Sequence, residues 1–155
     1  MPFRSSLVFA VLGLTGLTAY GDSQLPLSYV PRRVRAAIQG YVPGAELTKA
    51  EIANDDEWGT KYRCEYYRGG HKGKIQVSER GRLLDVDEDL DPRQLPPSVR
   101  RAAARESRGG VIRRAHLDED RGRMVFSVES FYGMSSAKVK LKVRRDGTVI
   151  ERDFD

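Results

Sequence analysis

The chain has 155 residues, of which 39% are hydrophobic and 32% are charged, and its formal net charge is +5. This length excludes two large independent domains, because a chain of this size forms one compact domain or two small units that share a core. Aromatic and β-branched residues are more frequent than in disordered chains, so the composition indicates a folded, well-solvated protein.

The first 21 residues have the pattern of a secretory signal peptide. Arg4 precedes an apolar run from Leu7 to Ala19, and small residues at Ala19 and Gly21 stand where a signal peptidase cleaves. The run is shorter than the roughly 20 residues that a membrane-spanning helix needs. We therefore expect an exported protein, periplasmic or extracellular, whose leader 1–21 is cleaved or else retained as an anchor. After cleavage we expect no stable membrane span.

Charge is unevenly distributed along the rest of the chain. Residues 22–91 contain 11 Lys and Arg against 13 Asp and Glu, whereas residues 92–155 contain 15 against 9. The second half is therefore the basic one, and a surface of one sign attracts partners of the opposite sign.

Residues 28–41 are predicted to form an amphipathic helix. Apolar side chains, Val34 and Ile38 among them, recur at helical spacing. Ser28 is expected to cap the start of this helix, and Pro43-Gly44 is expected to end it.

Alternation of polar and apolar residues then predicts four antiparallel strands. The first covers residues 45–53, the second covers 59–68, and the last two form a hairpin that turns at Arg80-Gly81. The side chains expected to face the helix are Tyr62, Cys64, Tyr66, Ile75, Val77, Leu84 and Val86.

Residues 92–155 repeat this order. The segment 95–102 overlays 30–37 with an offset of 65, and the hairpin 138–153, turning at Asp146-Gly147, overlays 72–87 with an offset of 66. We therefore expect an α+β fold of two tandem units, 22–91 and 92–155. Each unit has one helix and a four-stranded antiparallel sheet, and we expect one continuous or closely apposed sheet with both helices packed on one face. The inward side chains of the second unit are expected to be Met124, Phe126, Val128, Val139, Leu141, Val143 and Ile150.

These motifs resemble those of the PepSY-like proteins, whose tandem members are grouped with the β-lactamase inhibitory protein. The resemblance rests on the Leu-Pro-x-x-Val-x-x-Ala helix start at 95–102, the aromatic-x-Pro-Gly helix end at 41–44 and the Asp146-Gly147 turn. It covers nearly the whole chain after the leader. It implies a helix-plus-sheet fold, an exported location and a non-catalytic binding or inhibitory role.

No catalytic motif accompanies the two histidines, His71 and His116. Because the H-E-x-x-H, G-x-S-x-G, P-loop and C-x-x-C patterns do not occur, hydrolase, nucleotide and thiol-redox mechanisms have no local signature. We expect a protein that is not an enzyme and needs no cofactor. The single cysteine, Cys64, cannot close an intramolecular disulfide and is expected to be a small buried side chain rather than a reactive thiol.

The acidic run from Asp85 to Asp91 has two interpretations. Alternate carboxylates can converge on calcium, but this run lacks the glycine and the closing glutamate of an EF-hand loop. We favour the second interpretation, a solvated strand end before a short linker, and expect no metal site.

The candidate binding residues are charged and aromatic side chains expected on the uncovered sheet face and in the adjoining turns. Lysines alternate along 138–142 and so share one face. They could form cross-strand ion pairs with neighbouring carboxylates or present a positive surface to an acidic partner. Large exposed aromatic residues are common anchors of protein interfaces. The candidates are Trp58, Tyr67, Lys74, Glu129, Phe131, Lys138, Lys140 and Lys142.

We expect these residues to bind another protein or a peptide, with steric inhibition of an envelope or secreted enzyme as the leading mechanism. The alternative is a structural or sensing module of the cell envelope that binds an anionic polymer or ligand through arginines such as Arg100 and Arg101. Nucleic acid is not expected, because the basic region lacks stacking aromatic residues. The oligomeric state does not follow from the sequence.

Overall fold

A computed structural model describes residues 23–155 of the chain, and the expected leader 1–21 lies outside the described residues. The elements are β1 (Ser23–Leu25), η1 (Leu27–Tyr29), α1 (Arg32–Tyr41), β2 (Glu46–Asp55), β3 (Gly59–Arg68), β4 (His71–Ser78), β5 (Leu83–Leu90), η2 (Pro92–Gln94), α2 (Pro97–Glu106), β6 (Ile112–Asp120), β7 (Arg123–Phe131), β8 (Lys138–Val143) and β9 (Val149–Phe154). The two η elements are single turns of 3-10 helix.

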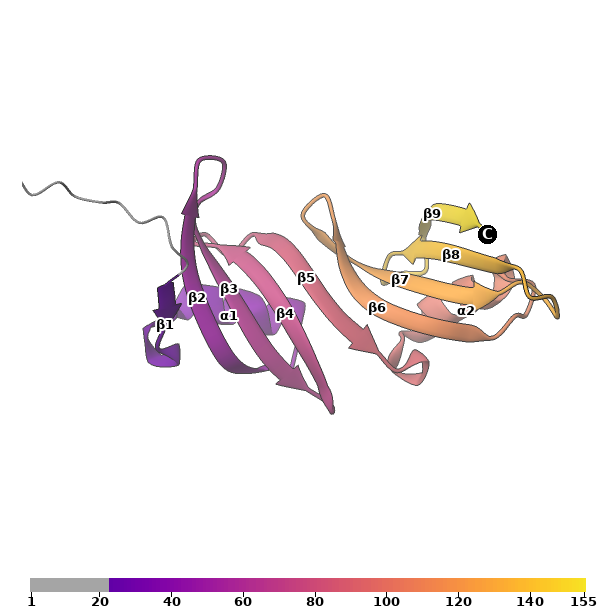
Figure 1. Ribbon diagram of the computed structural model, residues 1–155, viewed down its shortest axis with the longest axis horizontal. Helices are drawn as coiled ribbons and strands as arrows, with labels where there is room; N and C mark the ends of the chain where they lie inside the picture. Colours follow the sequence, from indigo (N-terminus) through magenta and orange to yellow (C-terminus); the bar gives the residue numbers. More distant parts are fainter. Residues whose placement is uncertain (1–22) are drawn as a thin grey trace, which may run out of the picture.

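All nine strands belong to one antiparallel sheet, in chain order from β1 to β9 (Figure 1). The expectation of two helix-plus-four-stranded units is therefore wrong, because the nine strands form one sheet with two short helices. The short connection through η2 and α2 brings β6 back beside β5, where Glu88, Asp89 and Leu90 pair with Leu117, His116 and Ala115. This pairing satisfies the backbone edge that β5 would otherwise expose to solvent. A further strand, β1, pairs with β2 at the edge of the sheet and was not predicted.

Both helices lie on the same face of the sheet (Figure 1). They are short, with ten residues each, and together bury Val34, Ile38, Val99, Ala102 and Ala103. Ser28 does not cap α1, because it lies in the separate turn η1 and Pro31 stands at the N-cap position instead. Proline fixes an extended entry into the helix at that point.

Four hairpins contain a register shift, and in two of them the shift changes which predicted side chain faces the core. In β4–β5 the register shifts after Gln76, so that Leu83 rather than Leu84 is buried. In β8–β9 a shift at the equivalent place makes Val149 rather than Ile150 pack against the core. A bulge adds one unpaired residue and reverses the inward phase beyond it. Both inward assignments were therefore wrong by one residue.

The core is one cluster of buried residues beneath both helices. Most of the predicted inward side chains belong to it, which confirms those assignments: Tyr62, Cys64, Tyr66, Ile75, Val77, Val86, Phe126, Val128, Val139, Leu141 and Val143. No helix within residues 23–155 is long and apolar enough to cross a membrane.

Candidate functional site

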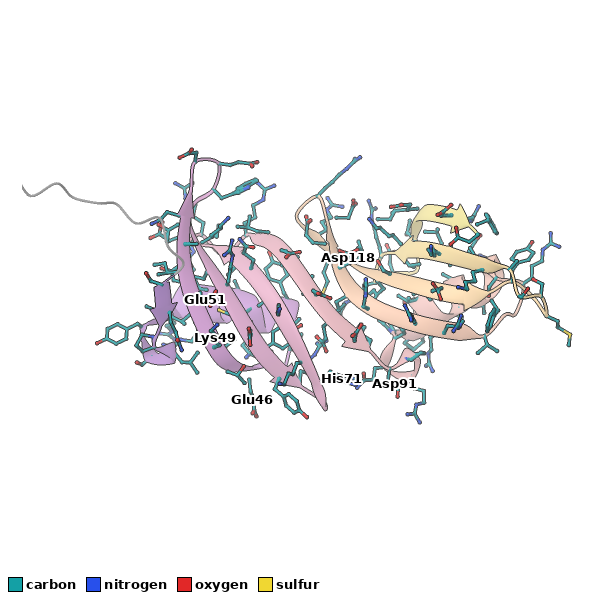
Figure 2. The ribbon with its side chains drawn as sticks, in the orientation of Figure 1. Glu46, Lys49, Glu51, His71, Asp91 and Asp118 are labelled. Atoms are coloured by element: carbon teal, nitrogen blue, oxygen red, sulfur yellow. The ribbon has the colours of Figure 1, made fainter. Side chains whose placement is uncertain are left out.

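The face of the sheet opposite the helices, called the open face below, is turned toward the viewer in Figure 1. Within residues 23–155 no helix covers it. Successive side chains of a strand point to opposite faces, so residues that alternate with core residues project from the open face. Figure 2 shows Lys49 and Glu51 on β2 and Asp118 on β6 among these side chains.

Two rows of alternating charge cross the open face. Each row consists of residues that are successive register partners on neighbouring strands. The first row, across β2 to β5, consists of Lys49, Glu65, Lys74 and Asp87. The second row, across β6 to β9, consists of Arg114, Glu129, Lys140 and Asp153. Opposite charges placed directly across strands stabilise a sheet, and they also give each row a defined charge sequence that a partner could match.

Two lysines of β8 are paired with carboxylates near the C-terminus. Lys140 Nζ lies 2.5 Å from Asp155 Oδ2, and Lys142 Nζ lies 3.2 Å from Glu151 Oε2. The hydrogen bond to the carboxylate and its negative charge raise the pKa of each lysine. These side chains remain partly exposed, so solvent screens the pairs and leaves the charged groups accessible.

Three hollows on the open face are bordered by charged side chains. The largest of these three, about 800 Å³, lies over β5 to β9, and His116, Glu129, Lys140 and Asp153 are among its lining residues. Two smaller hollows of about 310 and 400 Å³ lie over the first half of the sheet, and both are lined by Glu65, Lys74 and other residues. Charged side chains thus border hollows over both halves of the open face.

Most of the binding residues predicted from the sequence lie on the open face, but they do not form a single cluster. Lys74 belongs to the first row, whereas Glu129 and Lys140 belong to the second row. Lys142 lines the same large hollow as Glu129 and Lys140. Tyr67 is exposed and lines one of the smaller hollows. Phe131 and Lys138 are register partners at the ends of β7 and β8.

Trp58 lies apart from these hollows, in the turn between β2 and β3. The guanidinium of Arg82 lies 4.5 Å from the centre of its ring. Arg82 also approaches the β6–β7 turn, because a Cβ built on Gly122 would lie 3.5 Å from Arg82 Nε. Arg82 thus connects turns from the two halves of the sheet. The ring of Trp58 is therefore already engaged in a cation–π contact with Arg82 inside the protein.

A second aromatic group lies where the α2–β6 and β7–β8 connections meet. Arg113 lies 4.9 Å over the ring of Phe131, and Arg108 lies 5.2 Å over the ring of Tyr132. Tyr132 also meets Phe154 edge to face, with ring centres 5.6 Å apart. The ring of Phe131, one of the predicted binding residues, is therefore partly covered by the Arg113 guanidinium.

A buried network on the helix side was not predicted. The Glu88 side chain is only 2% exposed. Its carboxylate accepts a hydrogen bond from the Tyr66 hydroxyl at 2.5 Å and two from Arg68, at 2.7 and 3.2 Å. Burial, followed by the hydrogen bond to Glu88, raises the pKa of Tyr66 well above its usual range. The sequence did contain a signal for this position. Glu88 follows the inward Val86 by two residues in the same strand, so alternation places the Glu88 side chain on the helix side.

The acidic run does not converge on one point. Asp85, Asp87 and Asp89 are exposed, Glu88 is buried, and Asp91 caps η2 by accepting the Arg93 backbone N–H at 2.9 Å. Among residues 23–155 there is no group of three or more His, Cys, Asp or Glu side chains that could hold a metal ion. His116 Nδ1 lies 3.9 Å from Asp89 Oδ1, on the exposed β5–β6 junction.

Cys64 is expected to resist alkylation in the folded protein. The side chain is buried, and burial raises the pKa of its thiol to about 11. The reactive thiolate is therefore scarce at pH 8, and the reagent cannot reach it. Mass spectrometry after iodoacetamide treatment should show no labelling in buffer and complete labelling in concentrated urea. Rapid labelling in buffer would contradict this description of Cys64.

Comparison with known proteins gives structural similarities of low sequence identity. No protein-family model and no curated protein matches the chain. A BLIP-like protein from Bacteroides fragilis has 19% identity and a TM-score of 0.49, covering 81% of this chain and 88% of that one. A DUF2874 family protein from Bacteroides uniformis has 18% identity and a TM-score of 0.46, covering 81% and 90%. A protein of unknown function from Bacteroides vulgatus, described as a candidate periplasmic protein, has 13% identity and a TM-score of 0.48, covering 86% and 99%. These similarities assign neither a family nor a function to this chain.

Proposed function

We propose that this chain is an exported binding protein that engages another protein or a peptide through its open face. The observation that carries the proposal is the pair of alternating charge rows beside three hollows on an uncovered sheet face. A partner with the opposite charge sequence could pair all four of its charges with either row in only one register, which would fix its orientation. The expected leader supports a periplasmic or extracellular location.

The proposed role is steric rather than catalytic. Along each row, acids and bases oppose one another across strands, an arrangement that holds charges in place for recognition. General acid–base catalysis instead needs a group whose pKa is tuned toward the working pH and which can reach a reacting atom. A partner enzyme would be inhibited if the open face covered the entrance to its active site.

We also infer that residues 22–91 and 92–155 arose by duplication and now share the single sheet, in line with the resemblance to PepSY-like proteins. Lys49 and Arg114 are 65 residues apart, Glu65 and Glu129 are 64 apart, and Lys74 and Lys140 are 66 apart. The rows therefore repeat in sign and order. Core packing does not require charges on the opposite face, so the repeated rows support a role in recognition.

Affinity capture with residues 22–155 from the source organism's extracytoplasmic extract tests the proposal. We expect the unaltered protein to retain a partner that the double variant Lys74→Glu/Lys140→Glu does not retain, because the variant reverses one charge in each row. The matched control, Arg32→Glu/Arg100→Glu, makes the same change in net charge on the helix side and should still retain the partner.

Two outcomes would count against the proposal. One is a result in which nothing is retained above an unrelated protein of equal charge. The other is equal retention by the row variant and the unaltered protein. If the retained partner is an enzyme, steric inhibition predicts that its activity falls when the unaltered protein is added and is unaffected by the row variant.

A further inference from the structure

The lysines lie on one side of the sheet, whereas arginines occur on both sides. The seven lysines all lie in strands, at positions that face the open side: Lys49, Lys61, Lys72, Lys74, Lys138, Lys140 and Lys142. The two helices, by contrast, contain six arginines and no lysine: Arg32, Arg33, Arg35, Arg100, Arg101 and Arg105. All six are exposed. The open face thus carries lysines together with arginines such as Arg114, whereas the basic residues of the two helices are all arginine.

The helix arginines are largely uncompensated. α1 contains no acidic residue, and the single acidic residue of α2, Glu106, contacts Arg105 and Arg152. Within residues 23–155, no carboxylate lies within ion-pair distance of Arg32, Arg33, Arg35, Arg100 or Arg101; these five residues are called the arginine surface below. On the open face, several of the lysines are paired with carboxylates: Lys49, Lys140 and Lys142. The arginine surface therefore presents unneutralised positive charge.

The turns beside the helices extend this charge. The Arg80-Gly81 turn approaches α1, because a Cβ built on Gly81 would lie 3.0 Å from that of Ala37. The β8–β9 turn is fixed to α2 by the Ser98 hydroxyl, which donates to the Arg145 carbonyl at 2.5 Å. The exposed residues Arg80 and Arg145 thus belong to turns that border the two helices.

Exposed apolar side chains stand next to the arginines. η1, immediately before α1, carries Tyr29, which is 72% exposed, and Leu27, which is 38% exposed. Guanidinium groups bind phosphate in a bidentate manner, and tyrosine is enriched where one end of a ring meets lipid and the other meets water. The combination is typical of a surface that rests on phospholipid headgroups.

We propose that the arginine surface binds the phosphate headgroups of an anionic phospholipid bilayer. Both helices lie on one face of the sheet (Figure 1), so both can approach the same flat surface. A dissolved anionic polymer would require only the arginines, whereas a bilayer also buries Tyr29 and Leu27. This contact goes beyond the proposed protein binding, and it would leave the open face directed away from the membrane and accessible to a partner.

Co-sedimentation with lipid vesicles tests the proposal. Residues 22–155 should bind vesicles that contain phosphatidylglycerol, should not bind pure phosphatidylcholine, and should dissociate as salt is raised. The triple variant Arg32→Gln/Arg33→Gln/Arg35→Gln should bind roughly 100-fold more weakly, at about fivefold for each arginine. The control Lys49→Gln/Lys74→Gln/Lys142→Gln has the same net charge but should change binding only a few-fold, because its substitutions lie on the open face.

A second variant separates the bilayer from a dissolved polyanion. Tyr29→Ala should weaken vesicle binding several-fold and leave binding to soluble polyphosphate unchanged. If Tyr29→Ala does not affect vesicle binding while polyphosphate competes fully, the surface binds a polymer and the membrane proposal is wrong. The proposal is also overturned if the unaltered protein fails to bind phosphatidylglycerol at low salt or if the arginine and lysine variants lose binding equally.

Discussion

Replacing Gly73 with alanine should lower the free energy of unfolding by about 3 kcal/mol, at the upper end of the usual cost of overpacking a core. A Cβ at this position would lie 2.2 Å from Cζ of Tyr66 and 2.4 Å from its hydroxyl oxygen. Tyr66 is buried and is the direct register partner of Gly73, so its ring has no free space to enter. Moving the ring would also break its 2.5 Å hydrogen bond to Glu88. Urea unfolding followed by far-ultraviolet circular dichroism measures the change.

Gly40→Ala is the matched control for Gly73→Ala. Gly40 lies inside α1, and a Cβ built there meets no atom within 4 Å. Alanine should therefore leave stability unchanged or raise it by up to about 1 kcal/mol. A double-mutant cycle adds Tyr66→Ala, which removes the ring from the contact and should make Gly73→Ala much less costly. If Gly73→Ala costs the same with and without the Tyr66 ring, the steric explanation is wrong.

Local periodicity predicted the strands well where the turns on both sides were clear. The strand 59–68 was predicted with the bounds of β3, because glycines flank an alternating segment. The bulges at Leu84 and Ile150 could not be predicted in this way, because a register shift depends on how two strands pair rather than on either strand alone.

The pairing of β5 with β6 could not be predicted from local patterns, for a related reason. The acidic end of β5 resembles the charged edges that strands use to avoid further pairing. In the structure, Asp89 instead lies opposite His116, and Leu90 lies opposite Ala115. A pairing between segments that are separated by a helix depends on the whole chain, and neither segment carries a motif for it.

The candidate site could be predicted in part. Alternation correctly placed Lys138, Lys140 and Lys142 on one face, because side-chain direction has a period of two in a strand. It did not identify Asp155 as the partner of Lys140 or the continuation of each row across four strands. Binding at these residues stays a prediction.

Removing the guanidinium of Arg68 by Arg68→Ala should destabilise the protein by about 3 kcal/mol, because a buried carboxylate that loses its charged partner is costly. Glu88 is 2% exposed and receives two hydrogen bonds from Arg68. Without Arg68, only the Tyr66 hydroxyl donates to Glu88 among the side chains of residues 23–155. Urea unfolding of the single variant gives the change in stability.

Arg93→Ala provides the comparison, because burial is the main difference between the two ion pairs. Arg93 Nη2 lies 2.6 Å from Asp91 Oδ2, a distance close to the 2.7 Å of the Arg68–Glu88 pair, but its side chain is 88% exposed. Exposed pairs contribute little, since water solvates both charges when the pair breaks. Arg93→Ala should therefore leave the free energy of unfolding unchanged within error. Equal losses in the two variants would mean that burial does not account for the Arg68–Glu88 contribution.

The loss of Arg68 should also weaken the joint between the two halves of the sheet. Glu88 pairs in register with Gly73 on β4 and with Leu117 on β6, so its side chain lies where β5 joins the second half. An uncompensated charge at that position favours local opening that admits water. Hydrogen exchange of the backbone amides of β5 and β6 should therefore accelerate more in Arg68→Ala than exchange in β7 and β8. Uniform acceleration across all strands would indicate a global loss of stability and no particular role for the network at the junction.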